Sequence, residues 1–301
     1  MAAPSALPRL PVVFASIILL GRAWCPAQPD APAPEVWLLG GQSNMQGIAK
    51  VADIPADTPK AMPEVFFWTG RDFQALTIGA TQTSTRAGEF GPEIGLALAL
   101  AKPGRSVHLI KFAASGMPLH PGWNGDKWAG LPPQPGRRNF YPGEKPDDPN
   151  TGTLYREMRT RFQSGLAFLK KSGARPVVRG FIWMQGEQDA KNEESAGGYA
   201  RSLRQLHDRL AQDLEAGPAL PMVFGQVLPH EPALPRFTCR ALIRTRMAAA
   251  DERSGQAEAI PRVRMVSTDG FGVLADTVHF DAPAQLKLGR AFAATLAEMG
   301  K

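Results

Sequence analysis

The sequence predicts a three-layer α/β/α domain in which helices cover both faces of a parallel sheet. Two observations predict this class: continuous apolar or β-branched runs of strand length recur along the chain, and amphipathic helical patterns lie between them. No internal repeat, second domain or long linker interrupts the alternation. The expected strands are Val36 to Leu39, Val107 to Phe112, Val177 to Met184, Pro221 to Val227 and Val263 to Ser267.

The helical patterns place apolar side chains on one stripe. Apolar residues step by three and four positions between 154 and 169, and again from Tyr199 to Leu214. A third helix is expected over Gly91 to Ala101, and a fourth after Asp281, whose carboxylate suits an N-cap. The segment Pro118 to Asn150 has no periodicity and is long for a loop, so we expect it to be functional or a large excursion.

The first 27 residues have the pattern of a signal peptide. Arg9 precedes the apolar run Leu10 to Leu20, and small residues follow it up to an expected cleavage site near Ala27. The run is about half the ~20 residues that span a bilayer, so we expect export and cleavage, with no stable membrane insertion afterwards. Residues 28–34 read as a Pro/Ala-rich tether, and 35–301 as the domain. The predicted location is secreted or periplasmic.

Composition excludes several function classes. Lys and Arg number 34 against 28 Asp and Glu, but no run of five like charges marks a nucleic-acid arm, and we expect no nucleic-acid partner. Two cysteines cannot build a four-cysteine zinc site. The chain lacks a phosphate-binding GxxxxGK loop, a GxGxxG dinucleotide turn, an HExxH zinc motif and a GxSxG elbow. We therefore expect neither a cofactor nor a metal.

Unusual polar residues cluster where the expected strands end. Ligands of open α/β sheets bind outside the carboxyl ends of the strands, so chemistry is expected there. A further block lies directly before the last expected helix. The four blocks are GGQSNM at Gly40 to Met45, ASGM at Ala114 to Met117, QGEQD at Gln185 to Asp189, and DTVH at Asp276 to His279.

Together these blocks supply what acyl transfer requires. A serine needs a base to take its proton, and the base needs an acid that fixes its tautomer. Ser43 in its glycine-flanked turn is the candidate nucleophile, and His279 the candidate base. Asp276 lies three residues before His279, which on a helical turn brings both side chains to one face, so it is the candidate acid.

Donors for the developing oxyanion are also available in these blocks. The backbone N–H groups of Ser43 and Gly116 are candidates, and so is the side-chain amide of Gln185 or Asn44. Each feature alone has a structural explanation, since Ser and Gly are common turn formers.

The sequence gives weaker evidence about which residues contact the substrate. Gln42 beside the nucleophile and Trp123 in the long segment are candidates, although Trp123 could equally be a packing residue. Glu187 and Asp189 could instead be a solvated pair in a loop.

Five blocks of the chain closely resemble the sialate O-acetylesterase-like family, also called carbohydrate esterase family six, of the SGNH hydrolases. The resemblance implies a flavodoxin-like SGNH fold and metal-independent hydrolysis of O-acetyl esters on carbohydrates. The blocks are GGQSNMQG (Gly40 to Gly47), FGPEIGLALAL (Phe90 to Leu100), IKFAASGMPL (Ile110 to Leu119), FIWMQGEQDA (Phe181 to Ala190) and DTVHFDAPAQLKLGRAFA (Asp276 to Ala293).

By this resemblance Ser43 matches the nucleophile, His279 the base and Gly116 an oxyanion glycine, while Gln185 stands where the wider superfamily has an asparagine donor. Two residues remain candidates for the acid that orients His279. Asp276 matches the superfamily's DxxH acid, but in some relatives the glutamate of the QGE block, here Glu187, serves instead. The second block reads SGM where relatives commonly read GGT, so the wall beside the glycine is bulkier.

The sequence therefore predicts an exported serine esterase that removes acetyl groups from an acetylated poly- or oligosaccharide, such as acetylxylan or a sialic-acid-type glycan, through an acyl-enzyme. A carbohydrate-binding protein of the same fold without turnover is the alternative from another class. A general short-chain esterase is a third interpretation, which differs only in the lining of its pocket.

Overall fold

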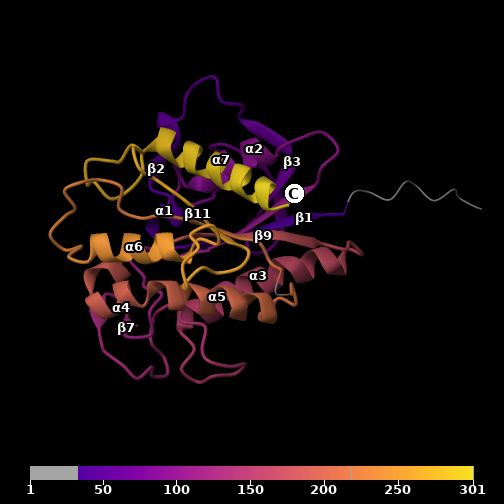
Figure 1. The fold of residues 1–301 in the computed structure, drawn as a ribbon. Coiled ribbons are helices and arrows are strands. Elements are labelled where there is room, and N and C mark those ends of the chain that lie inside the picture. The colour runs from indigo at the N-terminus through magenta and orange to yellow at the C-terminus, as the bar shows by residue number, and fades with distance from the viewer. Residues whose placement is uncertain (1–32, 218, 301) are drawn as a thin grey trace, which may run out of the picture. The chain divides into compact units, whose positions relative to one another are not determined.

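A seven-stranded sheet is the middle layer of the structure, a computed structural model that describes residues 33–217 and 219–300 (Figure 1). Neighbouring strands are parallel except for the last pair, β3 and β4. Across the sheet the strands follow the order β11 (Val263–Val266), β10 (Met222–Gly225), β9 (Val177–Met184), β1 (Glu35–Gly41), β6 (Val107–Ala113), β3 (Ala61–Trp68) and β4 (Phe73–Thr77).

The expected strands all form, and the reason is burial on both faces. In β1 every residue from Val36 to Gly41 is buried, and β9 is buried from Gly180 to Met184. Such strands cannot alternate apolar and polar residues, which is why continuous apolar runs predicted them. The three-layer α/β/α class with a parallel sheet is confirmed for the body of the sheet.

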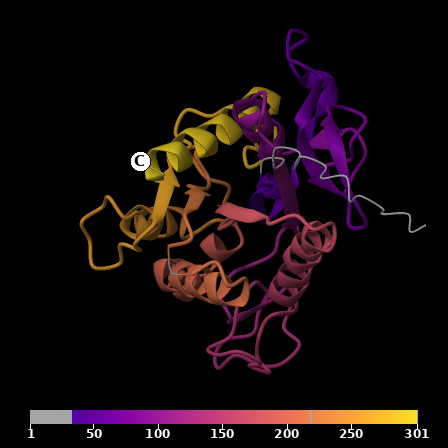
Figure 2. The same cartoon turned by 90° about the vertical axis from the view of Figure 1, so that its right-hand side faces the viewer.

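The sequence patterns did not predict β3 and β4, the two strands at one side of the sheet. Pro63 and Glu64 interrupt the apolar run of β3, and the pairing of β3 with β4 shifts register between Met62 and Phe66. β4 is partly exposed and antiparallel, so it lacks the continuous apolar signature. The sheet is therefore mixed at this edge, visible as the indigo and purple hairpin of Figure 2.

Helices cover both faces of the sheet (Figures 1 and 2). One face carries α2 and α7, which pack against each other, and the opposite face carries α3, α5 and α6, with the short α4 beside them. The bounds are α2 (Pro92–Leu100), α3 (Thr153–Lys171), α4 (Glu193–Gly197), α5 (Tyr199–Asp213), α6 (Arg240–Ala250) and α7 (Ala282–Met299).

Short elements fill the connections. The long segment Pro118 to Asn150 is an ordered excursion that holds one small antiparallel pair of strands and buries Phe140 and Tyr141. The short elements are α1 (Ser43–Gln46), the 3₁₀ turns η1 (Val51–Asp53) and η2 (Asp189–Lys191), and the strand pairs β2 (Ala49–Lys50) with β5 (Glu89–Phe90) and β7 (Trp123–Asn124) with β8 (Lys127–Trp128).

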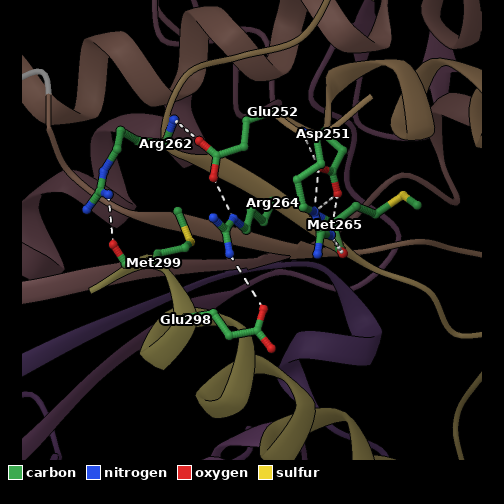
Figure 3. A network of polar contacts seen from close by, with 8 residues as sticks. Asp251, Glu252, Arg262, Arg264, Met265, Glu298 and Met299 are labelled. Atoms are coloured by element: carbon green, nitrogen blue, oxygen red, sulfur yellow. Dashed lines mark hydrogen bonds and ion pairs between the residues drawn. The ribbon is translucent and has the colours of Figure 1, made fainter. Parts of the chain in front are cut away.

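The last helix is fixed at both ends. Asp281 caps its first turn by accepting a hydrogen bond from the backbone N–H of Ala284 at 2.8 Å, as its position before the helix predicted. At the other end Arg262 donates to the carbonyl of Met299 at 2.8 Å, and Arg264 lies 3.5 Å from Glu298 (Figure 3). Because α7 directly follows the DTVH block, these anchors also hold that block in place.

Glycines let α2 and α7 approach closely. A Cβ atom at Gly289 would lie 2.0 Å from the carbonyl oxygen of Pro92, and one at Gly95 would lie 2.1 Å from that of Leu286. Both distances are below any contact that a methyl group can make, so the two backbones touch only because neither residue has a side chain.

Substitution of Gly289 by alanine is predicted to lower the free energy of unfolding by about 1–3 kcal/mol, because the clash with backbone atoms exceeds the gain in helix propensity. Gly197→Ala is the matched control, since a Cβ there meets nothing closer than 3.8 Å. Urea denaturation of both variants measures the difference. A Gly289→Ala protein as stable as the parent would contradict the close approach of the two helices.

The expected signal peptide, residues 1–27, and most of the expected tether, 28–34, lie outside the described residues. None of the helices in the described part of the chain combines the length and the hydropathy that a bilayer crossing requires.

Candidate active site

The polar blocks of the sequence meet at one edge of the sheet. β1 lies between β6 and β9, so Ser43, Gly116 and the segment after Met184 all follow the carboxyl ends of three adjacent parallel strands. The chain passes from β1 to one side of the sheet and returns to the other side at β9. This reversal of strand order is where open α/β sheets place their ligand sites.

Ser43, His279 and Asp276 form a hydrogen-bonded series. His279 Nε2 lies 2.9 Å from Ser43 Oγ, and His279 Nδ1 lies 2.5 Å from Asp276 Oδ2. Asp276 Oδ1 also accepts the backbone N–H groups of Val278 and His279, each at 2.9 Å. The spacing predicted a helical turn, but the segment is not helical, since Thr277 has φ +58°; the aspartate instead reaches the imidazole across an irregular turn.

Asp276 stays charged although it is partly buried. Burial acts to raise its pKa, but hydrogen bonds from the His279 ring and from two backbone N–H groups outweigh burial and lower the pKa below its ordinary value. A charged carboxylate on Nδ1 favours the tautomer whose Nε2 can accept the proton of Ser43. The arrangement suits a serine nucleophile with a histidine base.

A cavity of about 320 Å³ opens over this series. Most of its lining residues are polar, and they include three cationic side chains and two carboxylates. The lining residues are Gln42, Ser43, Gln46, Ile48, Arg86, Glu89, Ser115, Gly116, Glu187, Gln188, Lys191, Arg236, Phe237, Val278 and His279.

The backbone N–H groups of two residues that line the cavity are candidate oxyanion donors. Ser43 is the first residue of α1, where helical N–H groups have no partner within the helix, and Gly116 sits in a turn at φ +69°. Both residues line the cavity, and neither N–H donates to another described residue. A left-handed backbone at position 116 explains the glycine there.

The side-chain amides of Asn44 and Gln185 do not fit the oxyanion role that the sequence predicted. Asn44 Nδ2 donates to Glu187 Oε1 at 2.6 Å and to the carbonyl of Val278 at 3.1 Å. Gln185 Nε2 lies 2.6 Å from Asp189 Oδ2 and 3.2 Å from the carbonyl of Met117. The hydrogens of both amides are thus already donated, and neither residue lines the cavity.

Asn44 instead braces the histidine. While its Nδ2 holds the carbonyl of Val278, its Oδ1 accepts the backbone N–H of Phe280 at 3.0 Å. The residues on either side of His279 are therefore fixed to α1, the helix that carries Ser43. This explains how two blocks more than 200 positions apart keep a 2.9 Å contact.

Glu187 is not part of a solvated loop pair. It is 2% exposed and lines the cavity, but its hydrogen bond goes to Asn44 and not to the imidazole. Burial raises its pKa, although the Asn44 amide and the nearby His279 oppose that shift. The geometry therefore makes Asp276 the stronger candidate for the acid, and Glu187 a residue that acts through Asn44.

Of the two residues expected to contact substrate, only Gln42 lies at the cavity. Gln42 lines the cavity, and its Oε1 accepts the backbone N–H groups of Gly186 and Gln188 at 3.4 and 3.3 Å. Trp123 does not line it: the ring is 4% exposed and packs edge-on against Trp128 within the long excursion. Trp123 is a packing residue, as its alternative interpretation allowed.

Asp189 is a site residue whose role the sequence did not reveal. It is fully buried, and its carboxylate accepts the N–H groups of Leu119 and His120, each at 2.9 Å, as well as the Gln185 amide. It thereby fastens the segment that carries Gly116 to the segment after β9. Burial raises the pKa of Asp189 to about 6 despite these three donors.

Within residues 33–217 and 219–300, no three His, Cys, Asp or Glu side chains gather as the ligands of a metal ion would.

Comparison with known proteins identifies the family. Residues 33–298 match the family model described as carbohydrate esterase, sialic acid-specific acetylesterase. The chain belongs to this family of carbohydrate esterases. The match spans the sheet, both helical layers and the candidate site, so the resemblance drawn from the sequence blocks is confirmed. No curated protein matches the sequence.

Solved structures share the fold at low identity. A protein from Arabidopsis thaliana has a TM-score of 0.63 at 16% identity, with 89% of this chain and 99% of that chain covered. NanS has a TM-score of 0.58 at 13% identity, over 91% and 99%. A carbohydrate acetylesterase from Xanthomonas citri has a TM-score of 0.57 at 19% identity, over 88% of this chain and 57% of its own.

Replacing Asp276 and Glu187 in turn by their isosteric amides tests which of the two is the acid. We expect Asp276→Asn to lower kcat by up to ~10⁴-fold, because the amide no longer fixes the imidazole tautomer. Glu187→Gln should cost far less, since it weakens only the brace at Asn44. Steady-state kinetics of the single variants and of the double variant decide between them, with the exposed Asp269→Asn as control. A severe Glu187→Gln effect with a nearly silent Asp276→Asn would make Glu187 the acid.

Asp189 should add an ionisation to the acid side of the pH profile. Its pKa of about 6 lies above that of an ordinary aspartate, so its carboxylate is protonated below about pH 6, where it releases a donor and loosens the Gly116 segment. We expect log kcat/KM to fall more steeply below pH 6 in the parent protein than in Asp189→Asn, because the amide at position 189 does not titrate.

Asp189→Asn should also lower kcat/KM about ten- to a hundredfold at pH 8, because the backbone donor of Gly116 is misplaced. Asp208→Asn, at an exposed position on α5, is the control, and thermal unfolding confirms that both variants fold. Identical acid slopes for parent and variant would remove Asp189 from this role.

Proposed function

We propose that the protein is an exported serine esterase that hydrolyses O-acetyl esters on carbohydrates through an acetyl-enzyme at Ser43. The family supports carbohydrate deacetylation. The observation that carries the mechanism is the series Ser43–His279–Asp276 beneath a cavity that two unpaired backbone N–H donors border.

In the first half-reaction Ser43 Oγ attacks the carbonyl carbon of the acetyl group, while its proton passes to His279 Nε2. The carbonyl oxygen becomes an oxyanion, which accepts hydrogen bonds from the N–H groups of Ser43 and Gly116. Asp276 stabilises the imidazolium that forms. The bond between the acyl carbon and the sugar oxygen then breaks, and His279 returns the proton to the leaving sugar hydroxyl.

In the second half-reaction a water molecule takes the place of the sugar. His279 Nε2 accepts a proton from this water as its oxygen attacks the acetyl carbon, and the same two N–H groups hold the second oxyanion. The bond to Ser43 Oγ breaks and the proton returns to that oxygen, which releases acetic acid and restores the free enzyme. Each step uses only the Ser43–His279–Asp276 series and the backbone N–H groups of Ser43 and Gly116.

The cavity favours a polar alcohol over a lipid. Most of the residues that line it carry amide, hydroxyl or charged groups, beside the apolar Ile48, Phe237 and Val278. A sugar with free hydroxyls satisfies such a lining, whereas a long acyl chain would leave buried polar groups without partners. This supports a carbohydrate ester over a general lipid substrate.

Export is proposed from the first 27 residues. The basic residue, the short apolar run and the small residues before Ala27 have the features of a cleaved signal peptide. A secreted or periplasmic enzyme would meet acetylated glycans outside the cytoplasm.

Ser43→Ala should lower kcat on O-acetylated sugars by ~10³-fold or more while the fold is kept, as removal of an activated nucleophile does. A serine-directed phosphonate should label Ser43 in the parent protein and nothing in the variant. The exposed Ser164→Ala is the matched control, and it should keep both activity and labelling. Full turnover by Ser43→Ala would contradict the acetyl-enzyme and leave a binding protein or another mechanism to be considered.

A further inference from the structure

The turn that carries Gly116 has few contacts of its own. A Cβ atom at Gly116 would meet nothing within 4 Å, so the turn is not held in place by packing at this point. Among the described residues, neither Gly116 nor Ser115 makes a backbone hydrogen bond. The single hydrogen bond of the two residues is the one that Ser115 Oγ donates to Gln46 Oε1, at 3.0 Å.

The chain is fixed on both sides of this turn. Before it, the N–H group of Ala114 donates to the carbonyl of the last residue of β1 at 3.0 Å. After it, the carbonyl of Met117 accepts a side-chain amide at 3.2 Å. Between these two points the peptide groups of the turn can still rotate, which would redirect the candidate oxyanion donor. The bond to Gln46 is the contact that opposes this rotation.

Gln46 belongs to the helix that carries the nucleophile. It is the last residue of α1, whose first residue is Ser43. The helix has only four residues, and the N–H group of Gln46 donates to the carbonyl of Gln42 at 2.7 Å. A bond to the end of so short a helix also fixes the distance to its beginning. Gln46 and Ser115 therefore couple the two candidate oxyanion donors.

A buried ion pair holds Gln46 in place. Lys111 Nζ donates to the backbone carbonyl of Gln46 at 2.9 Å and to Glu93 Oε2 at 2.6 Å. The Lys111 and Glu93 side chains are 5% and 0% exposed, and Glu93 Oε1 also accepts the N–H group of Gly91 at 2.9 Å. A shift of Gln46 would take an acceptor from a buried ammonium, which is costly. The end of α1 is therefore a rigid support for the bond to Ser115.

We propose that Gln46 is a positioning residue that holds the Gly116 N–H group at a fixed separation from the Ser43 N–H group, through the hydroxyl of Ser115. The inference rests on the proposed function and deepens it, because both N–H groups serve there as donors to the oxyanion. Such donors stabilise the transition state more than the bound ester, so their placement affects kcat more than KM. A glycine, which commonly stands in place of Ser115 in relatives, could not make this bond.

Single variants test the bond without opening the core, because Gln46 and Ser115 both line the cavity. S115A and Q46M each remove the bond, and each should lower kcat on an acetylated sugar about tenfold while KM changes less than about twofold. S115T keeps a hydroxyl and should retain about half of the parent kcat or more. Q163M, at an exposed position on α3 outside this cavity, is the control and should match the parent.

The double variant shows whether the two side chains act through one bond. If they do, S115A/Q46M should be about tenfold slower than the parent, whereas independent effects would multiply to about a hundredfold. A hundredfold loss would overturn the proposal. So would a parental kcat in either single variant, or a change confined to KM.

Labelling by the serine-directed phosphonate gives a readout that does not depend on the sugar. An oxygen of the tetrahedral adduct occupies the position of the oxyanion, so the labelling rate of S115A should fall in parallel with kcat while the midpoint of thermal unfolding stays that of the parent. A lowered midpoint with a parental labelling rate would show a merely structural role and overturn the proposal.

The same measurements separate this inference from the proposed function. A parent enzyme that hydrolyses acetylated sugars, together with S115A and Q46M variants of equal kcat, overturns the positioning role and leaves the esterase. A parent protein with neither turnover nor labelling at Ser43 overturns both.

Discussion

The chemistry of this site depends on one imidazole ring that is hydrogen-bonded on both sides. His279 meets Ser43 at 2.9 Å through Nε2 and Asp276 at 2.5 Å through Nδ1. Ser43 follows the central strand, whereas His279 lies just before the last helix, so the contact requires two distant parts of the chain to be held to within tenths of an ångström. The Asn44 side chain provides this by bonding the backbone on either side of the histidine, and α7, the helix that follows the histidine, is anchored at its far end by Arg262.

The site also separates two carboxylates by their surroundings. Asp276 is 44% exposed, accepts hydrogen bonds from the imidazole and two backbone N–H groups, and has a lowered pKa. Glu187 is buried, has a raised pKa and bonds to a neutral amide. The first environment favours a permanent negative charge that can stabilise an imidazolium, and the second does not. Environment, and not residue type, therefore makes Asp276 the stronger candidate for the acid.

The sequence predicted what local spacing and burial determine. The strands covered on both faces, the cap at Asp281 and the Asp276–His279 contact all follow from neighbours within a few positions. Sequence could not show how the amides of Asn44 and Gln185 are occupied, because most of their acceptors lie more than 60 positions away in the chain. Nor could it place Lys191 and Arg236 at one cavity, since they converge only when η2 packs near the connection before α6. Strand β3, which lies beside the edge strand β4, was missed because Pro63 and Glu64 break its apolar run.

The tautomer of His279 tests the central claim most directly. Nitrogen-15 NMR of the free enzyme, at a pH where the ring is neutral, distinguishes a proton on Nδ1 from one on Nε2. The structure predicts the Nδ1-protonated form, with a strongly downfield proton in the bond to Asp276 and an unprotonated Nε2 that faces Ser43. Assignment of the signal follows from its loss in a His279 variant. A neutral ring that carries its proton on Nε2 would contradict the account, because that ring could not accept the proton of Ser43.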